Sequence, residues 1–375
     1  MVEREIKYLS ELCDIKTGKK DANHAVPDGI YRFYTCSNQY SMCNTKSFSG
    51  PCVIVPGNGD IGLVFYYDGE FEAYQRTYVL HNIKINPKYL YYHLCHKWRI
   101  RNSDKQFGST VRYVRMGNFT SYEVPVPPLS EQERIVARIE ELFSQLDAGV
   151  ETLKKIKVQL AIYRQAVLKE AFEGIETFIP LEKITIRVFD GPFGTNLKTA
   201  DYTDSGVRVV RLENLKNAWF DDTKKSFVTF EKYESIKAHT VFPFDLIMST
   251  FISDSIKICQ LPPYIGYAVN KADCVGIRLK AEIIPHFIMY YMSSRRAYND
   301  LVNQVHGATR PRVNTSQIKV LNVPIVEVKK QEIIVSKIES SLSVCDNIEQ
   351  TVDASLQQAD ALRQSILKDA FEGRL

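Results

Sequence analysis

Apolar residues recur every three or four positions across residues 135–167 and again across residues 334–366. The first set is Ile135, Ile139, Leu142, Leu146, Leu153, Ile156, Leu160, Tyr163 and Val167, with Gly149 as the one blank position. The second set, softer but in the same phase, is Ile334, Ile338, Cys345, Ile348, Val352, Ala359, Leu362 and Ile366. A narrow apolar seam at this spacing predicts a long amphipathic helix in each segment. About 40 residues would make a rod of roughly 60 Å.

The two predicted helices are copies of one element. LKEAFEG at residues 168–174 returns as LKDAFEG at residues 367–373, and at this offset VPVPPLSEQERIVARIEELFSQLD from Val124 lies over VPIVEVKKQEIIVSKIESSLSVCD from Val323. About twenty identities over roughly fifty positions at one offset indicate a duplication. Ser130 and Glu133 have the spacing of a capping box, and Gly174 and Gly373 are stop signals for the helices.

A helix with one apolar seam needs a partner in water, and this chain carries two such helices. The expected solution is an antiparallel coiled-coil pair with the globular segments carried at opposite ends, although an ordinary helical hairpin inside a core is the alternative. The predicted fold class is therefore α+β, with two globular domains separated by two long antiparallel helices and an internal pseudo-twofold repeat. The boundaries expected are 1–125 and 175–324 for the domains, and 126–174 and 325–375 for the helical spacers.

The globular segments are also distant copies of each other. VIVPGNGDIGLVFYY corresponds to LIMSTFISDSIKICQ, and PKYLYYHLCHKWRIRN to PHFIMYYMSSRRAYND, the latter pair being Pro-led, aromatic-rich helix candidates. Short β runs separated by Gly, Pro, Asn and Asp, with one or two helices, indicate an α+β domain rather than a parallel nucleotide-binding sheet.

Charge alternates along the chain in step with this organisation. The net charge is +4 for residues 1–123 and −1 for residues 124–174, then +4 for residues 175–322 and −3 for residues 323–375. The positive balance is thus confined to the globular segments, which suggests that they face a polyanion.

Basic residues, aromatics and amides occur together in both globular segments. Lysine and arginine supply affinity for phosphates, while arginine, asparagine and glutamine can form paired hydrogen bonds with base edges. For any single residue, a solvated surface charge is the competing interpretation. The candidate DNA-binding residues are Lys19, Lys20, Lys97, Arg99, Arg101, Lys105, Arg112, Arg115, Lys198, Lys216, Lys224, Lys225, Arg295, Arg296, Arg310, Arg312 and Asn314.

The sequence also contains patterns that resemble nucleotide-binding and metal-binding motifs, but the residues around them argue against those sites. Gly57-Asn-Gly59-Asp-Ile-Gly62 matches G-x-G-x-x-G, but a strand-like LVFYYDG follows instead of a helix, so we expect a hairpin or loop. His93, Cys95 and His96 lie on an aromatic helix and are expected to pack rather than to bind metal. The eight cysteines form no C-x-x-C pair, so reduced thiols are expected. We find no nucleophile constellation and no cofactor or metal site.

Two basic domains alternating with two repeated helices, joined by VPVPPLSEQERIVARIEELF and LKEAFEG, make the chain resemble the DNA specificity subunit of type I restriction-modification systems. The resemblance covers essentially the whole chain. The segment at the start of the second predicted helix departs from the family pattern. In VPIVEVKKQEIIVSKIE, Val-Glu-Val-Lys-Lys-Gln stands in place of Pro-Pro-Leu-Ser-Glu-Gln.

The resemblance implies a non-catalytic subunit of an adenine-N6 methyltransferase and endonuclease complex. Each globular domain would be a target recognition domain that reads half of a bipartite, asymmetric site in double-stranded DNA. The helices would set the gap and dock two methyltransferase subunits, and the assembly can recruit two restriction subunits. S-adenosylmethionine, ATP and Mg would be bound by those partners, with no cofactor in this chain.

Two other functions remain open from the sequence. One is a methyltransferase or nuclease that carries its own recognition domain, and the other is a coiled-coil adaptor whose basic domains bind nucleic acid or protein outside restriction. No apolar run is long enough to span a bilayer and the start, MVEREIKYLSELCDIK, is charged, so a cytoplasmic location without a membrane partner is expected.

Overall fold

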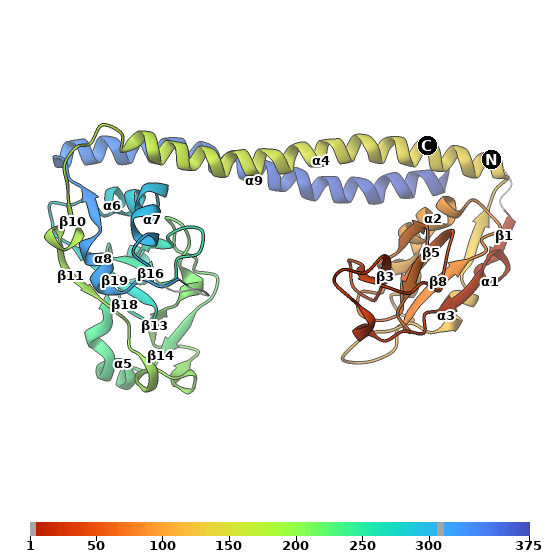
Figure 1. The fold of residues 1–375 in the computed structure, drawn as a ribbon, viewed down its shortest axis with the longest axis horizontal. Coiled ribbons are helices and arrows are strands. Elements are labelled where there is room, and N and C mark those ends of the chain that lie inside the picture. Colours follow the sequence, from red (N-terminus) through yellow and green to blue (C-terminus); the bar gives the residue numbers. More distant parts are fainter. Residues whose placement is uncertain (1–4, 306–310) are drawn as a thin grey trace. The chain divides into compact units, whose positions relative to one another are not determined.

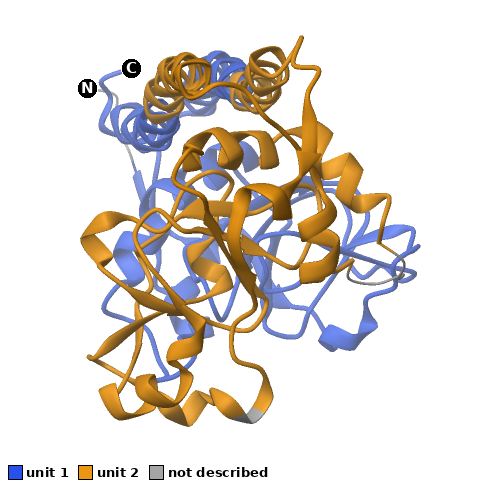
Figure 2. Cartoon of the chain, turned by 90° about the vertical axis from the view of Figure 1, so that its left-hand side faces the viewer, with its two compact units in different colours: residues 1–154, 353–375 blue, residues 155–352 orange. Residues whose placement is uncertain are grey.

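The computed structural model describes residues 5–305 and 311–375, and the chain divides into two compact units (Figure 2). Unit 1 comprises residues 1–154 together with 353–375, and unit 2 comprises residues 155–352. The two long helices, α4 (Leu129–Ala171) and α9 (Val328–Glu372), each run from one unit into the other. Unit 1 is therefore completed by the C-terminal end of the chain.

Unit 1 contains two small sheets and one main helix. The four-stranded sheet has the order β2-β8-β5-β6 and is antiparallel, whereas in the three-stranded sheet β4-β3-β7 strands β3 and β7 are parallel. Strands β1 and β9 pair separately. The elements are β1 (Glu5–Tyr8), α1 (Leu9–Leu12), β2 (Asp14–Thr17), β3 (Tyr31–Tyr34), β4 (Ser41–Cys43), β5 (Pro51–Pro56), β6 (Phe65–Asp68), β7 (Phe71–Ala73), β8 (Thr77–His81), α2 (Pro87–Asn102), α3 (Met116–Thr120) and β9 (Glu123–Val126).

Unit 2 repeats this plan with a larger second sheet. Its four-stranded sheet has the order β11-β19-β16-β17, and its five-stranded sheet β12-β14-β13-β18-β15 again contains one parallel pair, β13 with β18. The elements are β10 (Phe178–Pro180), β11 (Thr185–Phe189), β12 (Tyr202–Thr203), β13 (Val207–Val210), β14 (Ser226–Val228), α5 (Phe230–Ile236), β15 (Thr240–Val241), β16 (Leu246–Ser249), β17 (Ile258–Gln260), β18 (Ala268–Asn270), β19 (Cys274–Leu279), α6 (Pro285–Met292), α7 (Arg295–Val302), α8 (Thr315–Val320) and β20 (Asn322–Pro324). The predicted α+β class and internal repeat are confirmed.

The long helices pack against each other in antiparallel fashion within each unit (Figure 1). In unit 2, Arg164 Nη2 of α4 lies 2.7 Å from Asp346 Oδ1 and 2.9 Å from Glu349 Oε2 of α9. In unit 1, Asp147 pairs with Arg363, and Arg134 Nη1 donates to the carbonyl of Leu375 at 3.1 Å. Residues late in one helix thus lie beside residues early in the other. The antiparallel pairing that the two apolar seams predicted is confirmed.

Burial differs between positions of the apolar seam. Ile135, Ile139 and Ile338 are buried, but the side chains of Tyr163 and Leu362 remain about half exposed. Besides each other, the long helices contact the globular domains only in part, for example where Phe143 of α4 meets Tyr92 of α2, so seam positions outside such contacts stay in solvent.

The C-terminal ends of the long helices agree with the sequence prediction, whereas the N-terminal end of α4 differs from it. Gly174 and Gly373 have φ of 75° and 78°, the left-handed conformation expected of helix stop signals. The predicted capping box was wrong, because α4 begins at Leu129, ahead of Ser130. The carbonyl of Pro128 accepts the first amides instead, those of Glu131 and Gln132.

The repeated Ala-Phe-Glu-Gly motif supplies an aromatic side chain that anchors the helix end to the globular domain. In unit 1, the ring of Phe371 lies 5.3 Å from that of Tyr89 and 5.1 Å from that of His93 on α2, centroid to centroid. In unit 2, Phe172 lies 5.4 Å from Phe287 and 5.3 Å from Tyr291 of α6. Burying one such ring stabilises the contact by about 1.5–3 kcal/mol.

A buried glutamine at the start of each long helix forms a second contact with the globular domain. We call the aromatic contact and the glutamine contact together the joint between a long helix and its domain. The side-chain oxygen of Gln132 accepts from the amide of Asn86 at 2.9 Å, and that of Gln331 accepts from the amide of Ile284 at 2.9 Å. Each glutamine also donates to the backbone carbonyl five residues earlier. Both side chains are buried and bonded through the oxygen as well as the nitrogen, so each joint fixes the start of the aromatic helix to the long helix.

The aromatic helices differ between the units. The first, predicted as one helix, is α2, whose N-terminus is capped by Asn86 Oδ1. The second is broken at Ser293 and Ser294 into α6 and α7, where one helix was expected. Serine hydroxyls compete for backbone partners, and Ser294 caps the new helix by accepting from the amide of Ala297.

The joint predicts the effect of a substitution at Gln132. Gln132→Ala removes the partners of the part-buried Asn86 amide and of the buried Pro127 carbonyl, so the free energy of unfolding of unit 1 should fall by about 2 kcal/mol. Chemical denaturation followed by Trp98 fluorescence, in a Trp219→Phe background, measures this because Trp98 lies in the core of unit 1.

The matched control is Gln145→Ala, an exposed position of the same helix, which should change the denaturation midpoint very little. Equal effects of the two variants would show that the buried glutamine does not hold the joint.

Candidate nucleic-acid interface

A loop at the end of β5 organises the candidate interface of unit 1. This strand-end loop, Gly57–Gly62, lies between β5 and β6, which pair as an antiparallel hairpin, so the expectation of a hairpin is confirmed. A Cβ on Gly57 would lie 2.3 Å from the carbonyl oxygen of Arg76, so the close approach of two backbones requires glycine there. No helix starts at this loop, and Gly59 has a φ of 78°, a left-handed conformation that favours glycine.

Three of the predicted arginines surround this loop. Arg99 Nη2 lies 2.7 Å from Asp60 Oδ1 of the loop. The carbonyl of Arg112 accepts from the amide of Gly59 at 3.0 Å. Arg115 stacks its guanidinium 4.0 Å from the centroid of Phe107 and donates to the hydroxyl of Tyr113 at 2.9 Å. The structure therefore brings Arg99, Arg112 and Arg115 to one place.

Lys20 reaches the same region from another element. Its carbonyl accepts from the amide of Gln75 at 2.9 Å, in the turn between β7 and β8. Gln75 and Arg76 are both exposed and, with Arg115, line a cavity of about 460 Å³. Neither was a candidate from the sequence, although a Gln-Arg dipeptide between two strand-like runs is a signal that could have identified them.

The other candidates in unit 1 lie outside this cluster. Arg101 pairs with Glu123 at 2.6 Å, next to the ring of Tyr122. Lys105 is exposed, and its carbonyl accepts from the side chain of Asn118. Lys97 is half-buried, and Lys19 lines a separate cavity of about 380 Å³ with Lys16.

Unit 2 has the same backbone hydrogen-bond arrangement around its own strand-end loop, residues 250–255. We call this arrangement the frame of the loop. The amide of Thr250 donates to the carbonyl of Asp273 at 2.9 Å, as Gly57 does to Arg76 at 2.8 Å. Two of the predicted arginines meet here. Arg295 donates to the carbonyl of Asp254 at 3.1 Å, and Arg312 pairs with Asp273 at 3.4 Å.

The remaining candidates of unit 2 are dispersed. Asn314 uses its side chain to cap α8, accepting from the amide of Gln317 at 2.9 Å. Arg296 stacks 4.2 Å from the centroid of Phe178. Lys198 is exposed beside Asp201, which accepts from the backbone amide of Lys198. Arg310 lies outside the described residues.

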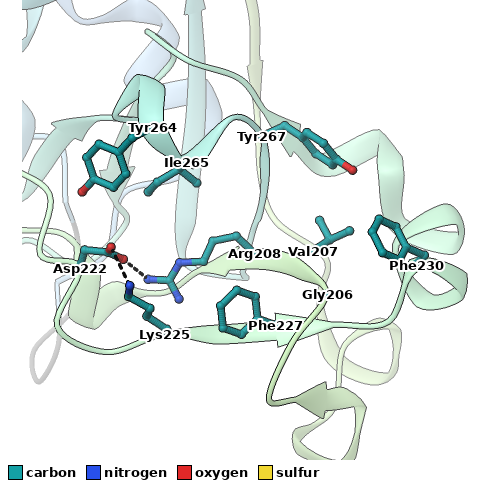
Figure 3. A pocket seen from close by; sticks show the side chains of 10 residues that line it. All are labelled: Gly206, Val207, Arg208, Asp222, Lys225, Phe227, Phe230, Tyr264, Ile265 and Tyr267. Carbon is teal, nitrogen blue, oxygen red and sulfur yellow. Dashed lines mark hydrogen bonds and ion pairs between the residues drawn. The ribbon is translucent and has the colours of Figure 1, made fainter.

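One predicted lysine, Lys225, lines the cavity of about 300 Å³ shown in Figure 3, and two others, Lys216 and Lys224, form ion pairs close to it in the sequence. Lys225 pairs with Asp222 at 3.4 Å, Lys216 with Asp221 at 3.2 Å and Lys224 with Glu213 at 3.8 Å. The nearby Arg208 is buried and directs its guanidinium to Asp222 at 2.8 Å. Arg208 is therefore structural, whereas the lysines sit in exposed pairs that contribute little to stability.

The histidines on α2 pack as the sequence suggested. His93 and His96 are buried against Phe371, and burial lowers the pKa of His93 to about 3. No group of three or more His, Cys, Asp or Glu within residues 5–305 and 311–375 could hold a metal ion. All eight cysteines are free, and burial raises the pKa of Cys13 to about 12 and of Cys52 to about 11.

The duplicated sequence and duplicated frame match one protein family. Residues 1–160 and 194–358 match the family described as the type I restriction modification DNA specificity domain. The chain belongs to this family. As a specificity subunit of a type I restriction-modification complex, it is a non-catalytic component. This membership decides against the self-contained enzyme and against the adaptor outside restriction.

Individual relatives agree with the family match. The chain is 27% identical to the EcoDI specificity subunit of Escherichia coli, covering 98% of this chain and 87% of that protein. It is 25% identical to the EcoKI specificity subunit of Escherichia coli strain K12, over 74% of this chain and 63% of that protein.

A solved structure shares the fold. It comes from work on complex assembly and conformational transition of the type I restriction-modification system, and it aligns with a TM-score of 0.74 at 14% identity. The alignment covers 100% of this chain and 98% of that one. Within the described part of the specificity subunit, no helix has the length and hydropathy of a membrane span.

Proposed function

We propose that this specificity subunit reads a bipartite, asymmetric site in double-stranded DNA, one half with each globular domain. Residues 1–125 would form the first target recognition domain and residues 175–324 the second. Residues 126–174 and 325–375 would form the spacer that sets the unspecified gap between the half-sites.

The observation that carries this proposal is the duplicated joint. Phe172 and Phe371, and likewise Gln132 and Gln331, occupy equivalent places in the two units. Two copies of one backbone frame, connected by a shared helix pair, are suited to binding two places along one elongated ligand. The frames carry different side chains, which suits two different half-sites.

The charges around the strand-end loops support DNA as the ligand. Arg99 and Arg295 hold these loops by exposed contacts with Asp60 and with the carbonyl of Asp254. Exposed ion pairs and exposed hydrogen bonds contribute little in water, so both arginines can turn to phosphate groups at little cost. Binding would then release counterions and weaken as salt increases.

The partners follow from the family and from the repeat. Two equivalent joints suit two methyltransferase subunits, and two restriction subunits can complete the complex. S-adenosylmethionine, ATP and Mg would be bound by those subunits. The methyltransferase would flip its adenine out of the duplex into its own pocket.

Geometry makes the helix pair a ruler in this proposal. Half-sites read from one side of a duplex lie about one turn, roughly 34 Å, apart. Helices of 43 and 45 residues are long enough to span that separation.

The function predicts a specific methylation pattern. Co-expressed with its methyltransferase subunit in a host without DNA methylation, the chain should direct adenine methylation to a split motif with a fixed gap. Sequencing that detects modified adenines across the genome gives both half-sites. A soluble complex of the two subunits that modifies no adenine would contradict the proposal.

The ruler predicts the effect of lengthening both helices. Seven residues inserted after Lys154 and seven after Val352 preserve the heptad and add about 10 Å to each helix. The gap should grow by about three base pairs while both half-sites stay the same, as read by the same sequencing.

Inserting the seven residues in α4 alone is the control, because it shifts one seam against the other and should abolish methylation. An active double-insertion variant with the original gap would rule out the ruler.

A further inference from the structure

The turn between β7 and β8 presents an arginine that the fold does not use. The side chain of Arg76 is exposed. Among the arginines within residues 5–305 and 311–375, it is the one whose side chain has no hydrogen bond, ion pair or ring contact. The adjacent Gln75 is exposed as well, and its side chain has no partner either.

The backbone beneath these two side chains is firmly held. The amide of Gln75 donates to Lys20, and the carbonyl of Arg76 accepts from Gly57 at 2.8 Å. The amide of Thr77 closes the turn by donating to Tyr74 at 2.8 Å. Free side chains on a fixed backbone are well suited to recognition, because less order must be imposed when a ligand binds.

Arg76 also borders open space next to a second arginine. The cavity of about 460 Å³ is lined by Gln75, Arg76 and Arg115 together with Tyr78 and Tyr113. Arg115 is already oriented by Phe107 and Tyr113. Two guanidinium groups and an amide beside one concave surface fit the edge of a base pair together with its phosphate.

The other unit holds the opposite chemistry at the equivalent place. The frame is the same, since Val114 donates to the carbonyl of Gly57 in unit 1 and Val313 donates to that of Thr250 in unit 2, at 2.8 and 2.9 Å. At the position of Arg76, however, unit 2 has Asp273, which is neutralised by Arg312 at 3.4 Å. The same backbone frame thus carries an unpaired arginine in unit 1 and an aspartate paired with Arg312 in unit 2. We expect the two domains to differ at this position in what they recognise.

We propose that Arg76 is a specificity-determining residue of unit 1, which reads a guanine through its O6 and N7 atoms while Gln75 contacts the neighbouring base pair. Arginine forms two parallel hydrogen bonds with that guanine edge, and glutamine can do the same with adenine. Arg115 binds the adjoining phosphate. This inference rests on the proposed function, because it concerns the half-site that unit 1 reads.

The test compares the motifs methylated by variants co-expressed with the methyltransferase subunit. Arg76→Ala should relax one position of one half-site, lowering discrimination there by roughly ten- to a hundredfold, with the other half-site unchanged. Arg76→Lys keeps the charge but not the paired hydrogen bonds, so it should relax the same position. Gln75→Ala should relax only a position next to it.

The control is Lys46→Ala, which removes a positive charge from unit 1 at an ion pair with Glu70 and should leave the motif unchanged. An unchanged motif in both Arg76 variants would overturn the proposal. So would a uniform loss of methylation in Arg76→Ala that Arg76→Lys restores, because that result indicates a phosphate contact. Failure of the proposed function would look different, because the unaltered chain would then produce no split motif.

Discussion

A long helix with one apolar seam cannot remain alone in water, and the structure depends on how this chain satisfies that constraint. In each unit, α4 and α9 cover each other in antiparallel fashion, and the ion pairs Arg164–Asp346 and Asp147–Arg363 flank the seam. Because both helices run through both units, the C-terminal residues 353–375 are part of unit 1. The pairing that buries the seam therefore also joins the beginning of the chain to its end.

The joints convert this pairing into a defined attachment for each globular domain. Phe371 packs among Tyr89, His93 and His96, and Phe172 packs against Phe287 and Tyr291. Burial keeps His93 neutral, so its imidazole acts as an apolar ring in this contact. The repeated heptapeptide is thus explained by packing, and the duplicated attachment is what makes two recognition events by one chain physically reasonable.

The sequence predicted the repeat, the helix pair and the hairpin at Gly57, because each leaves a periodic or local pattern. It did not predict the break at Ser293 and Ser294, since serine hydroxyl competition depends on the surrounding backbone. Charge runs identified Arg99, Arg112 and Arg115, which do gather around one loop. Arg76 was missed because the Gln-Arg dipeptide between two strand-like runs is a weak signal beside the longer charge runs, and the fold is what brings it beside Arg115. The DNA contacts of all these residues remain predictions.

The central claim is that each globular domain reads its own half of one site. Photo-crosslinking tests this most directly, using the assembled complex and a duplex with a photoreactive thymine analogue in one half-site or the other, followed by identification of the crosslinked peptides. The account predicts that one half-site crosslinks to residues 1–125 and the other to residues 175–324. Crosslinks from both half-sites to the same domain would contradict it.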